Sequence, residues 1–159
     1  GGGAMQTAFE YVMSAPVEGL VSGLLYAYSS ATMLGTTGVC NSTLASLDHR
    51  IAMITGYAQV SMSASEESGM RLAVLSSPYT AAINARSMQT YISGVNCPRK
   101  CTDDVDHAVM VVGYGTEKKT YWLIRNTWGS DWGEEGYYRL CSGKNKCGVA
   151  LDAVVAINT

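Results

Sequence analysis

Residues 107–141 read HAVMVVGYGTEKKTYWLIRNTWGSDWGEEGYYRLC, and this stretch decides the fold. Its runs HAVMVVGYG, YWLIRNT and GYYRLC are short and rich in Val, Ile, Tyr and Trp, and turns containing Gly, Asn or Lys separate them. Such runs are typical of β-strands. YTAAINA at residues 79–85 has the same character. The later half of the chain is therefore predicted to be β.

The earlier half carries helical patterns. Apolar residues recur at the spacing of one buried helix face near the start of the chain, at Met5, Ala8, Phe9, Val12 and Met13. Residues 63–78, SASEESGMRLAVLSSP, predict a second helix that Ser65 caps and Pro78 stops. Residues 17–43 predict a long surface connection, and residues 49–60 have strand-like content. The class is α+β, a helical lobe beside an antiparallel barrel or sheet.

Length and composition narrow the function. A chain of 159 residues with 47% hydrophobic and 15% charged residues suits one globular domain, or two lobes that share a core. The net charge of −2 and the absence of a basic stripe argue against a nucleic-acid partner. No apolar run reaches the roughly 18 residues of a membrane span, so we expect no membrane association.

Cysteine usage indicates disulfides rather than a metal site. No CxxC pair occurs among the five cysteines, and the chain has two histidines, so we expect no metal and no cofactor. Cys97 and Cys101 share one loop, and Cys141 and Cys147 flank another. These four predict two disulfides and an oxidising compartment, which leaves Cys40 for a partner elsewhere. The sequence NST makes Asn41 a candidate glycosylation site, in keeping with the secretory route.

His107 is the candidate catalytic group, although a single histidine before a strand is more often structural. Asn126 ends a predicted strand, and Trp128 and Trp132 follow in a glycine-punctuated loop. An amide oxygen that accepts the ring N–H fixes the orientation and tautomer of a histidine base, and indoles shield that bond from water. The alternative is that both tryptophans belong only to the core. The other histidine, His49, is expected at the solvated surface.

The segments DHAVMVVGYG, YWLIRNTWGSDWGEEGYYRL and NKCGVALDA resemble the papain-like cysteine peptidases of the cathepsin L-like type, and the resemblance runs through the whole chain. It implies a papain-like two-lobe fold. Residues 1–60 would be the remainder of the helical left lobe, residues 61–150 the antiparallel β-barrel right lobe, and residues 151–159 a C-terminal strand that crosses back to the left lobe.

The same resemblance implies roles for the site residues. His107 would be the base and ion-pair partner of a cysteine, Asn126 would orient it, and Trp128 and Trp132 would shield the pair. Asp106 would have a supporting role, although the acidic segment TDDVD also suits a solvated loop.

The nucleophile of the family lies in a segment where cysteine precedes tryptophan, and no cysteine here is followed by Trp. In the family pattern that cysteine comes just before the glycines, so the missing segment would precede Gly1. The resemblance implies that Cys40 bridges back to this segment, as a separate chain or as part of a longer one. It also implies that Cys147 pairs with Cys97 or Cys101, and that Cys141 takes the other.

The resemblance places a peptide-binding groove as well. Gly2 and Gly3 align with a glycine stretch that lets substrate backbone approach, although a flexible chain end is the alternative. The S2 pocket would be lined by Met5, Ala82, Val105 and Ala108, with Asp152 at its base. A carboxylate there pairs with an Arg guanidinium, so we expect Arg as well as Leu or Phe at P2, unless Asp152 turns to solvent.

Three function classes follow. The first is a papain-type cysteine endopeptidase, active only with the missing segment, in a lysosomal, vacuolar or secreted setting. Its partners would be peptide or protein substrates, that N-terminal segment, and a propeptide or cystatin-like inhibitors. The second is a non-proteolytic papain-like structural or binding protein with the nucleophile replaced. The third is an unrelated α+β binding domain.

Overall fold

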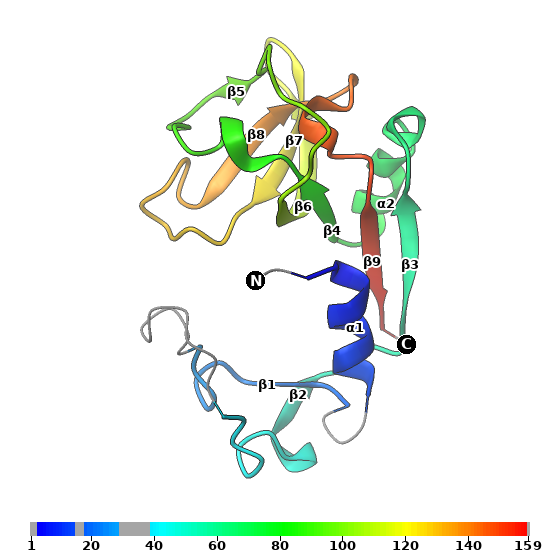
Figure 1. Ribbon diagram of the computed structural model, residues 1–159, viewed down its shortest axis with the longest axis vertical. Helices are drawn as coiled ribbons and strands as arrows, with labels where there is room; N and C mark the ends of the chain where they lie inside the picture. Colours follow the sequence, from blue (N-terminus) through cyan, green and yellow to red (C-terminus); the bar gives the residue numbers. More distant parts are fainter. Residues whose placement is uncertain (1–2, 15–17, 29–38, 159) are drawn as a thin grey trace. The chain divides into compact units, whose positions relative to one another are not determined.

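The computed structural model describes residues 3–14, 18–28 and 39–158 (Figure 1). The chain forms two compact units. The first unit comprises Gly1–Tyr57 with Ala156–Thr159, and the second unit comprises Ala58–Val155. Gly2, which is predicted to lie in the substrate groove, is outside the described residues.

The first unit contains the predicted early helix, α1 (Met5–Met13). Met5 is its buried residue, and the Phe9 ring packs against Tyr57 with ring centroids 6.0 Å apart. The Tyr57 hydroxyl donates to the Glu10 carboxylate at 2.8 Å. The predicted apolar face of α1 is thus only partly buried among the described residues: Phe9, Val12 and Met13 are half-buried, and Ala8 is exposed.

The remainder of the first unit is mostly turns. Within the predicted surface connection, β1 (Leu20–Val21) pairs with β2 (Arg50–Ala52) in an antiparallel ribbon. A 3₁₀ turn, η1 (Leu47–His49), precedes β2. Further along, the Asn41 side chain accepts the Thr43 N–H at 3.1 Å, a turn within the NST sequence.

A seven-stranded sheet provides the core of the second unit (Figure 1). Its order is β3 (Gly56–Ser61), β9 (Ala153–Ile157), β4 (Tyr79–Ile83), β6 (His107–Thr116), β7 (Thr120–Arg125), β8 (Tyr137–Cys141) and β5 (Val95–Asn96). The central pairs are antiparallel, and β5 joins β8 in parallel. The strands predicted from residues 79–85, 107–115, 121–127 and 136–141 are confirmed.

The sheet is open rather than closed into the predicted barrel, because its order begins at β3 and ends at β5. The short terminal strand accounts for this difference. β5 has only 2 residues, and most of the segment between β4 and β6 forms turns. Such a segment offers too few ladder hydrogen bonds to join the two edges of the sheet.

Alternation along the strands builds the core. On β6, β7 and β8 alternate side chains are buried on one face, among them Val109, Val111, Trp122, Ile124, Tyr138 and Leu140. This period of two is the pattern of a sheet with one buried face. The residues between them on β6 point to the other face, where Met110 is 39% exposed.

The helix predicted over residues 63–78 is interrupted. It consists of a 3₁₀ turn, η2 (Ala64–Glu66), and a short helix, α2 (Met70–Ser76). The cap is Ser63 and not the predicted Ser65: the Ser63 N–H donates to the Glu66 carboxylate at 3.2 Å, within a capping box. The break comes at Glu67, which turns inward and is only 5% exposed.

Glu67 holds three N–H groups from distant parts of the second unit. Its Oε1 accepts from Trp122 Nε1 at 2.9 Å and from Gly143 N at 2.7 Å. Its Oε2 accepts from Asn145 N at 2.6 Å. A buried carboxylate is tolerated when its oxygens are hydrogen-bonded in this way. The carboxylate therefore ties the η2–α2 segment to β7 and to the loop after β8.

Two disulfides, Cys97–Cys141 and Cys101–Cys147, are present in the second unit. They confirm the two predicted bridges and select Cys101 as the partner of Cys147. Both tie the turn-rich segment between β4 and β6 to the end of β8 and the loop that follows. Cys40 is exposed and free in this chain.

The described residues show neither a membrane-spanning helix nor a cluster of metal-ligating side chains. None of their helices has the length and apolar character needed to cross a membrane. They also contain no group of three or more His, Cys, Asp or Glu residues that could hold a metal ion.

We predict that Glu67→Ala lowers the free energy of unfolding by roughly 3 kcal/mol or more, since it leaves three N–H groups without their acceptor. Glu117→Ala is the matched control. Glu117 pairs with Arg139 at 2.8 Å at the surface, and we expect its loss to cost less than about 1 kcal/mol. Urea denaturation followed by tryptophan fluorescence measures both values. If both variants lowered the free energy of unfolding equally, the buried Glu67 would stabilise the fold no more than a surface carboxylate does.

Candidate active site

His107 and Asn126 meet at one end of the β6–β7 pair. His107 begins β6, and Asn126 directly follows β7. His107 Nε2 lies 2.8 Å from Asn126 Oδ1. Because an amide oxygen can only accept, Nε2 donates in this bond. In the neutral ring the other nitrogen, Nδ1, is then the basic one, and the described residues give it no hydrogen-bond partner.

A shift of register in the sheet makes this meeting possible. Gly113 is opposite Leu123, whereas Val111 is opposite Ile124, so one extra residue of β6 lies between these pairs. Beyond the shift Met110 is opposite Arg125. Continuing that register places Asn126 opposite Val109, on the same face as His107. Without the extra residue, each later residue of β7 would pair with the next residue along β6. Asn126 would then be opposite Met110 and lie on the face away from His107.

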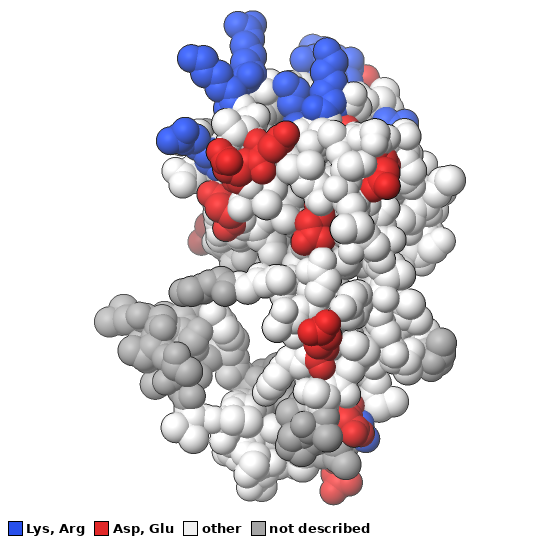
Figure 2. All heavy atoms as spheres, turned by 45° about the vertical axis from the view of Figure 1, so that its right-hand side comes forward, with Lys and Arg blue, Asp and Glu red and all other residues white. Residues whose placement is uncertain are grey.

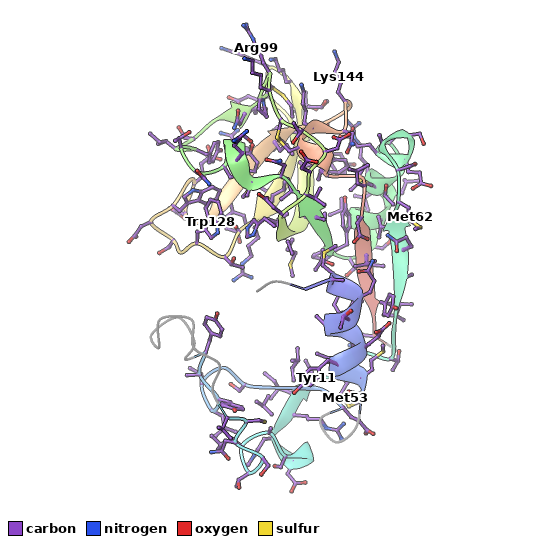
Figure 3. All side chains as sticks on the ribbon, in the orientation of Figure 1. Tyr11, Met53, Met62, Arg99, Trp128 and Lys144 are labelled. Atoms are coloured by element: carbon purple, nitrogen blue, oxygen red, sulfur yellow. A yellow bond between two sulfur atoms is a disulfide. The ribbon has the colours of Figure 1, made fainter. Side chains whose placement is uncertain are left out.

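Trp128 covers the pair. Its indole stacks on the His107 ring, with centroids 5.2 Å apart and planes at 29°. The same register places Trp128 opposite His107. Trp128 is 40% exposed and stands at the surface of the second unit (Figure 3). Its other neighbour is Trp132, at 5.2 Å and 78°.

Trp132 anchors the loop to the core. Its Nε1 donates to Met88 O at 3.1 Å, and its ring contacts those of Tyr91 and Tyr138. Trp132 is half-buried, so the core interpretation of this tryptophan is correct and is compatible with support for Trp128. The two indoles thus form one continuous layer from the core to the imidazole.

The loop between β7 and β8 is held closed by its own residues. Asn126 is 7% exposed, and its N–H donates to Gly136 O at 2.9 Å. Gly133 has a φ of +63°, and a Cβ there would lie 2.7 Å from Tyr137 O, so only glycine fits. These two features fix where Asn126 can point.

Glu134 adds an electrostatic tie. Its carboxylate accepts from Arg139 Nε at 2.7 Å and Nη2 at 2.6 Å, and from Gly94 N at 2.9 Å. The hydrogen bonds from Arg139 and then that from Gly94 hold the pKa of Glu134 at about 2, against its partial burial. The residue pattern alone gave no signal for this interaction, because Gly94 lies 40 residues away.

Asp106 lies next to His107 in sequence but uses its carboxylate elsewhere. Asp106 Oδ1 accepts the Ala85 N–H at 2.8 Å, and the Asp106 N–H donates to Ile83 O at 3.1 Å. These bonds fasten the residues just before β6 to the end of β4. The structure therefore shows Asp106 setting the backbone next to His107, and a role in tuning an ion pair stays a prediction.

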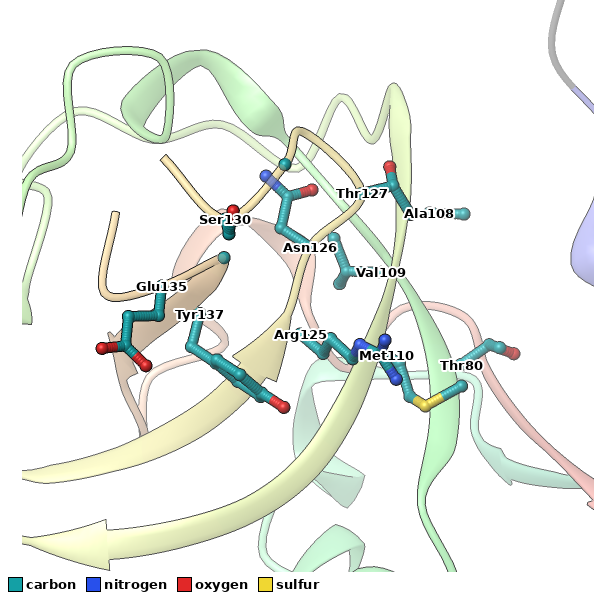
Figure 4. Close-up of a pocket in the computed structure, with 12 residues that line it drawn as sticks. Thr80, Ala108, Val109, Met110, Arg125, Asn126, Thr127, Ser130, Glu135 and Tyr137 are labelled. Atoms are coloured by element: carbon teal, nitrogen blue, oxygen red, sulfur yellow. The ribbon is translucent and has the colours of Figure 1, made fainter. Parts of the chain in front are cut away.

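A cavity of about 680 Å³ opens beside Asn126 (Figure 4). It includes Ala108 and Met110 of β6, Arg125 at the end of β7, and Tyr137 at the start of β8. Asn126 Nδ2 is buried and has no partner among the described residues. The cavity thus lies next to Asn126, whereas His107 is not among the residues that line it.

Several residues predicted to line the S2 pocket do lie together. Ala82 is opposite Ala108 across the β4–β6 ladder, next to the pair formed by Ile83 and His107. The Ala82 N–H donates to Asp152 O at 2.8 Å, which places Asp152 beside Ala82. Val105 is 39% exposed on the chain just before His107.

The Asp152 carboxylate has a partner that the sequence did not indicate. Asp152 Oδ1 accepts from Gln59 Nε2 at 3.1 Å. The described Gly3 and Met5 belong to the first unit, where Gly3 is exposed and Met5 is buried. Their predicted contribution to a substrate groove stays a prediction.

The second unit, to which His107 belongs, contains no free thiol. Four of the cysteines are consumed by disulfides, and the fifth, Cys40, belongs to the first unit. The second histidine is also elsewhere: His49 Nδ1 lies 3.1 Å from Ser46 Oγ and the residue is half-buried, not fully solvated as expected. His107 and Asn126 are hydrogen-bonded to each other, and their roles as a base and its orienting group stay predictions.

The chain is similar to known proteins of one family. A family model described as papain family cysteine protease matches residues 1–157. The probable cysteine protease RD19B of Arabidopsis thaliana is 37% identical over 167 residues, which cover 99% of this chain and 43% of that protein. Cysteine proteinase 15A of Pisum sativum is 38% identical over 157 residues, 93% of this chain and 40% of that protein. The chain thus spans less than half the length of these relatives.

Solved structures of papain-like proteases match the fold of this chain. Bromelain from Ananas comosus, in complex with the inhibitor E64, matches with a TM-score of 0.84 and 34% identity over 99% of this chain and 71% of the bromelain chain. The digestive procathepsin L 3 of Tenebrio molitor larval midgut matches with a TM-score of 0.84 and 30% identity over 99% of this chain and 49% of that chain. With sequence and structure in agreement along nearly its whole length, the chain belongs to the papain family of cysteine proteases.

Proposed function

We propose that this chain is the C-terminal portion of a papain-type cysteine endopeptidase, and that it supplies the base and the orienting amide of a Cys–His–Asn site. The observation that carries the proposal is the 2.8 Å hydrogen bond between His107 Nε2 and Asn126 Oδ1, covered by the stacked indole of Trp128. This bond leaves Nδ1 as the nitrogen that exchanges a proton with a thiol.

The proposed chemistry is acyl transfer. Nδ1 of His107 takes the thiol proton, and the thiolate attacks the carbonyl carbon of the scissile peptide bond. The imidazolium then gives its proton to the leaving amine as the C–N bond breaks, and an acyl-enzyme thioester remains. A water molecule, deprotonated by the same nitrogen, hydrolyses the thioester and returns the thiol. Asn126 keeps the ring in one orientation and tautomer throughout.

The cysteine of this site would come from a segment N-terminal to Gly1. Two features support the presence of such a segment. The chain spans 43% and 40% of the two plant relatives, and Cys40 is exposed and free to form a bridge. The cavity beside Asn126 and the 39% exposed Met110 that lines it would also suit a surface that further chain covers. A vacuolar, lysosomal or secreted setting fits the two disulfides, and glycosylation at Asn41 would fit the same route.

Intact mass tests the missing segment directly. We expect the protein purified from its natural source to carry a further segment, released by reduction of a bridge at Cys40 or continuous with Gly1. Its sequence should contain cysteine followed by tryptophan. A Cys40→Ser variant, which cannot form the bridge, is the control for release. Serine in place of that cysteine would assign the protein to the non-proteolytic relatives instead.

The positioning role of Asn126 has its own test in the complete enzyme. We expect Asn126→Ala to lower kcat/KM by about 100-fold, because the ring loses the group that fixes its orientation. The alkaline limb of the pH–rate profile should also move to lower pH, since the imidazolium loses a hydrogen-bond acceptor.

Asn96→Ala is the matched control for Asn126→Ala. It removes a different side-chain amide of the second unit, a half-buried one that donates to the Tyr138 hydroxyl at 3.1 Å and lies outside the site. We expect it to lower stability without moving the pH profile. An unchanged profile in Asn126→Ala, with activity lost only through unfolding, would reduce Asn126 to a structural residue.

Substrate preference at P2 tests Asp152. We expect Asp152→Ala to lower kcat/KM for a substrate with Arg at P2 by at least about tenfold, because the guanidinium loses its carboxylate partner. The value for the matched Leu substrate should change by less than about twofold. Fluorogenic dipeptide amides measure both, and Asp48→Ala in the first unit is the charge control. Equal turnover of the Arg substrate by Asp152→Ala would contradict the assignment.

A further inference from the structure

The positive charge of the second unit is concentrated at one end of it. The chain has 11 Lys and Arg residues, and all of its lysines fall in three loops, together with Arg99. These loops comprise residues 98–100, 117–119 and 142–146. Their basic residues, which we call the basic end, are Arg99, Lys100, Lys118, Lys119, Lys144 and Lys146. Figure 2 shows most of the Lys and Arg side chains of that view gathered at its top, and Figure 3 labels Arg99 and Lys144 at the top of the second unit.

Nothing in the sequence marks this cluster, because no loop holds more than two of these residues side by side. Folding brings them together. The first loop follows β5, the second connects β6 to β7, and the third follows β8. The Cys97–Cys141 bridge then fixes the first loop to the third.

A hollow of about 460 Å³ lies among these loops. Arg99, Lys119, Lys144 and Lys146 line it. Thr120 and Ser142 belong to the same lining, and the Ser142 hydroxyl accepts from Arg71 Nη2 at 3.2 Å. Arg99, Lys119 and Lys144 are exposed, whereas Lys146 donates to Pro98 O at 3.1 Å and is half-buried. The hollow therefore offers cationic groups together with hydroxyl groups.

The acidic residue of these loops does not cancel the charge. Glu117 is bound by Arg139 Nη1 at 2.8 Å, so its carboxylate already has a cationic partner outside the basic end. The basic end is therefore a local region of net positive charge on a protein whose net charge is −2.

We propose that the basic end binds a linear anionic polysaccharide. Each exposed lysine contributes little to an isolated ion pair, so a ligand must engage several at once. A polymer with regularly repeated sulfate or carboxylate groups does so, and its sugar hydroxyls match Thr120 and Ser142. Disulfides place the chain in an oxidising compartment, where such glycans occur.

The lining of the hollow disfavours other polyanions. It contains no aromatic ring on which a nucleic-acid base could stack. Its apolar members are the disulfide cysteines Cys97 and Cys141, so it presents no large apolar side chain that could enter a lipid surface. The basic residues are also separate from His107 and Asn126, so this inference does not depend on the peptidase proposal.

Binding of the 159-residue chain to immobilised heparin and polygalacturonate tests the inference, with neutral dextran as the blank. We expect salt-dependent binding to at least one of the two anionic polymers and none to dextran. The preferred polymer then tells whether sulfate or carboxylate is the ligand group. No binding to either at about 50 mM salt, where screening is weak, would overturn the proposal.

Matched double variants locate the site. Lys119→Gln with Lys144→Gln should weaken binding about tenfold and make its salt dependence shallower by about two charge contacts. Arg86→Gln with Arg125→Gln removes the same charge from exposed positions of the second unit outside the basic end, and we expect less than about a twofold change. Equal weakening by both pairs would show only a net-charge effect. Stronger competition by an oligonucleotide or by anionic vesicles than by either polysaccharide would also overturn the proposal.

Discussion

The β6–β7 pairing, with its one-residue shift of register, is the constraint on which the candidate site depends. Two side chains that are 19 positions apart meet because the ladder places the start of β6 beside the end of β7. The shift between Val111 and Gly113 then decides which face Asn126 shares. A sheet without it would carry the same residues and present the amide away from the imidazole. The buried Glu67 supports this ladder from the other end, since it holds Trp122 of β7.

The strands and the residues of the candidate site could be predicted from the sequence, because short local patterns indicate both. Alternating apolar residues mark β6, and Asn126 and Trp128 follow a strand that is equally clear. The features that it did not predict depend on partners far away in the chain. The break in the helix at Glu67 depends on N–H groups of Trp122, Gly143 and Asn145. The register shift and the open sheet likewise follow from pairing, which no single segment encodes.

Acidity is the condition that the loop after β7 must withstand if the protein works in a vacuole or lysosome. A carboxylate whose pKa is lowered by folding contributes its full stability at pH values above its ordinary pKa. This contribution declines as the pH falls from the ordinary pKa to the lowered one, but in the folded state the group stays ionised until the pH reaches the lowered pKa. For Glu134 that value is about 2. Its bonds to Arg139 and Gly94 therefore persist at pH 4 to 5, and the loop keeps Asn126 and Trp132 in place there.

The two ends of the β6–β7 pair carry different chemistry. His107 begins β6, and the turn with Lys118 and Lys119 follows its last residue, Thr116. A strand of 10 residues, at about 3.3 Å per residue, separates these ends by about 30 Å. Charges interact over only about 8 Å at physiological salt, so the lysines lie well beyond that distance from the His–Asn pair. A polyanion bound at the basic end would therefore localise the protein and leave the His–Asn pair accessible to substrate.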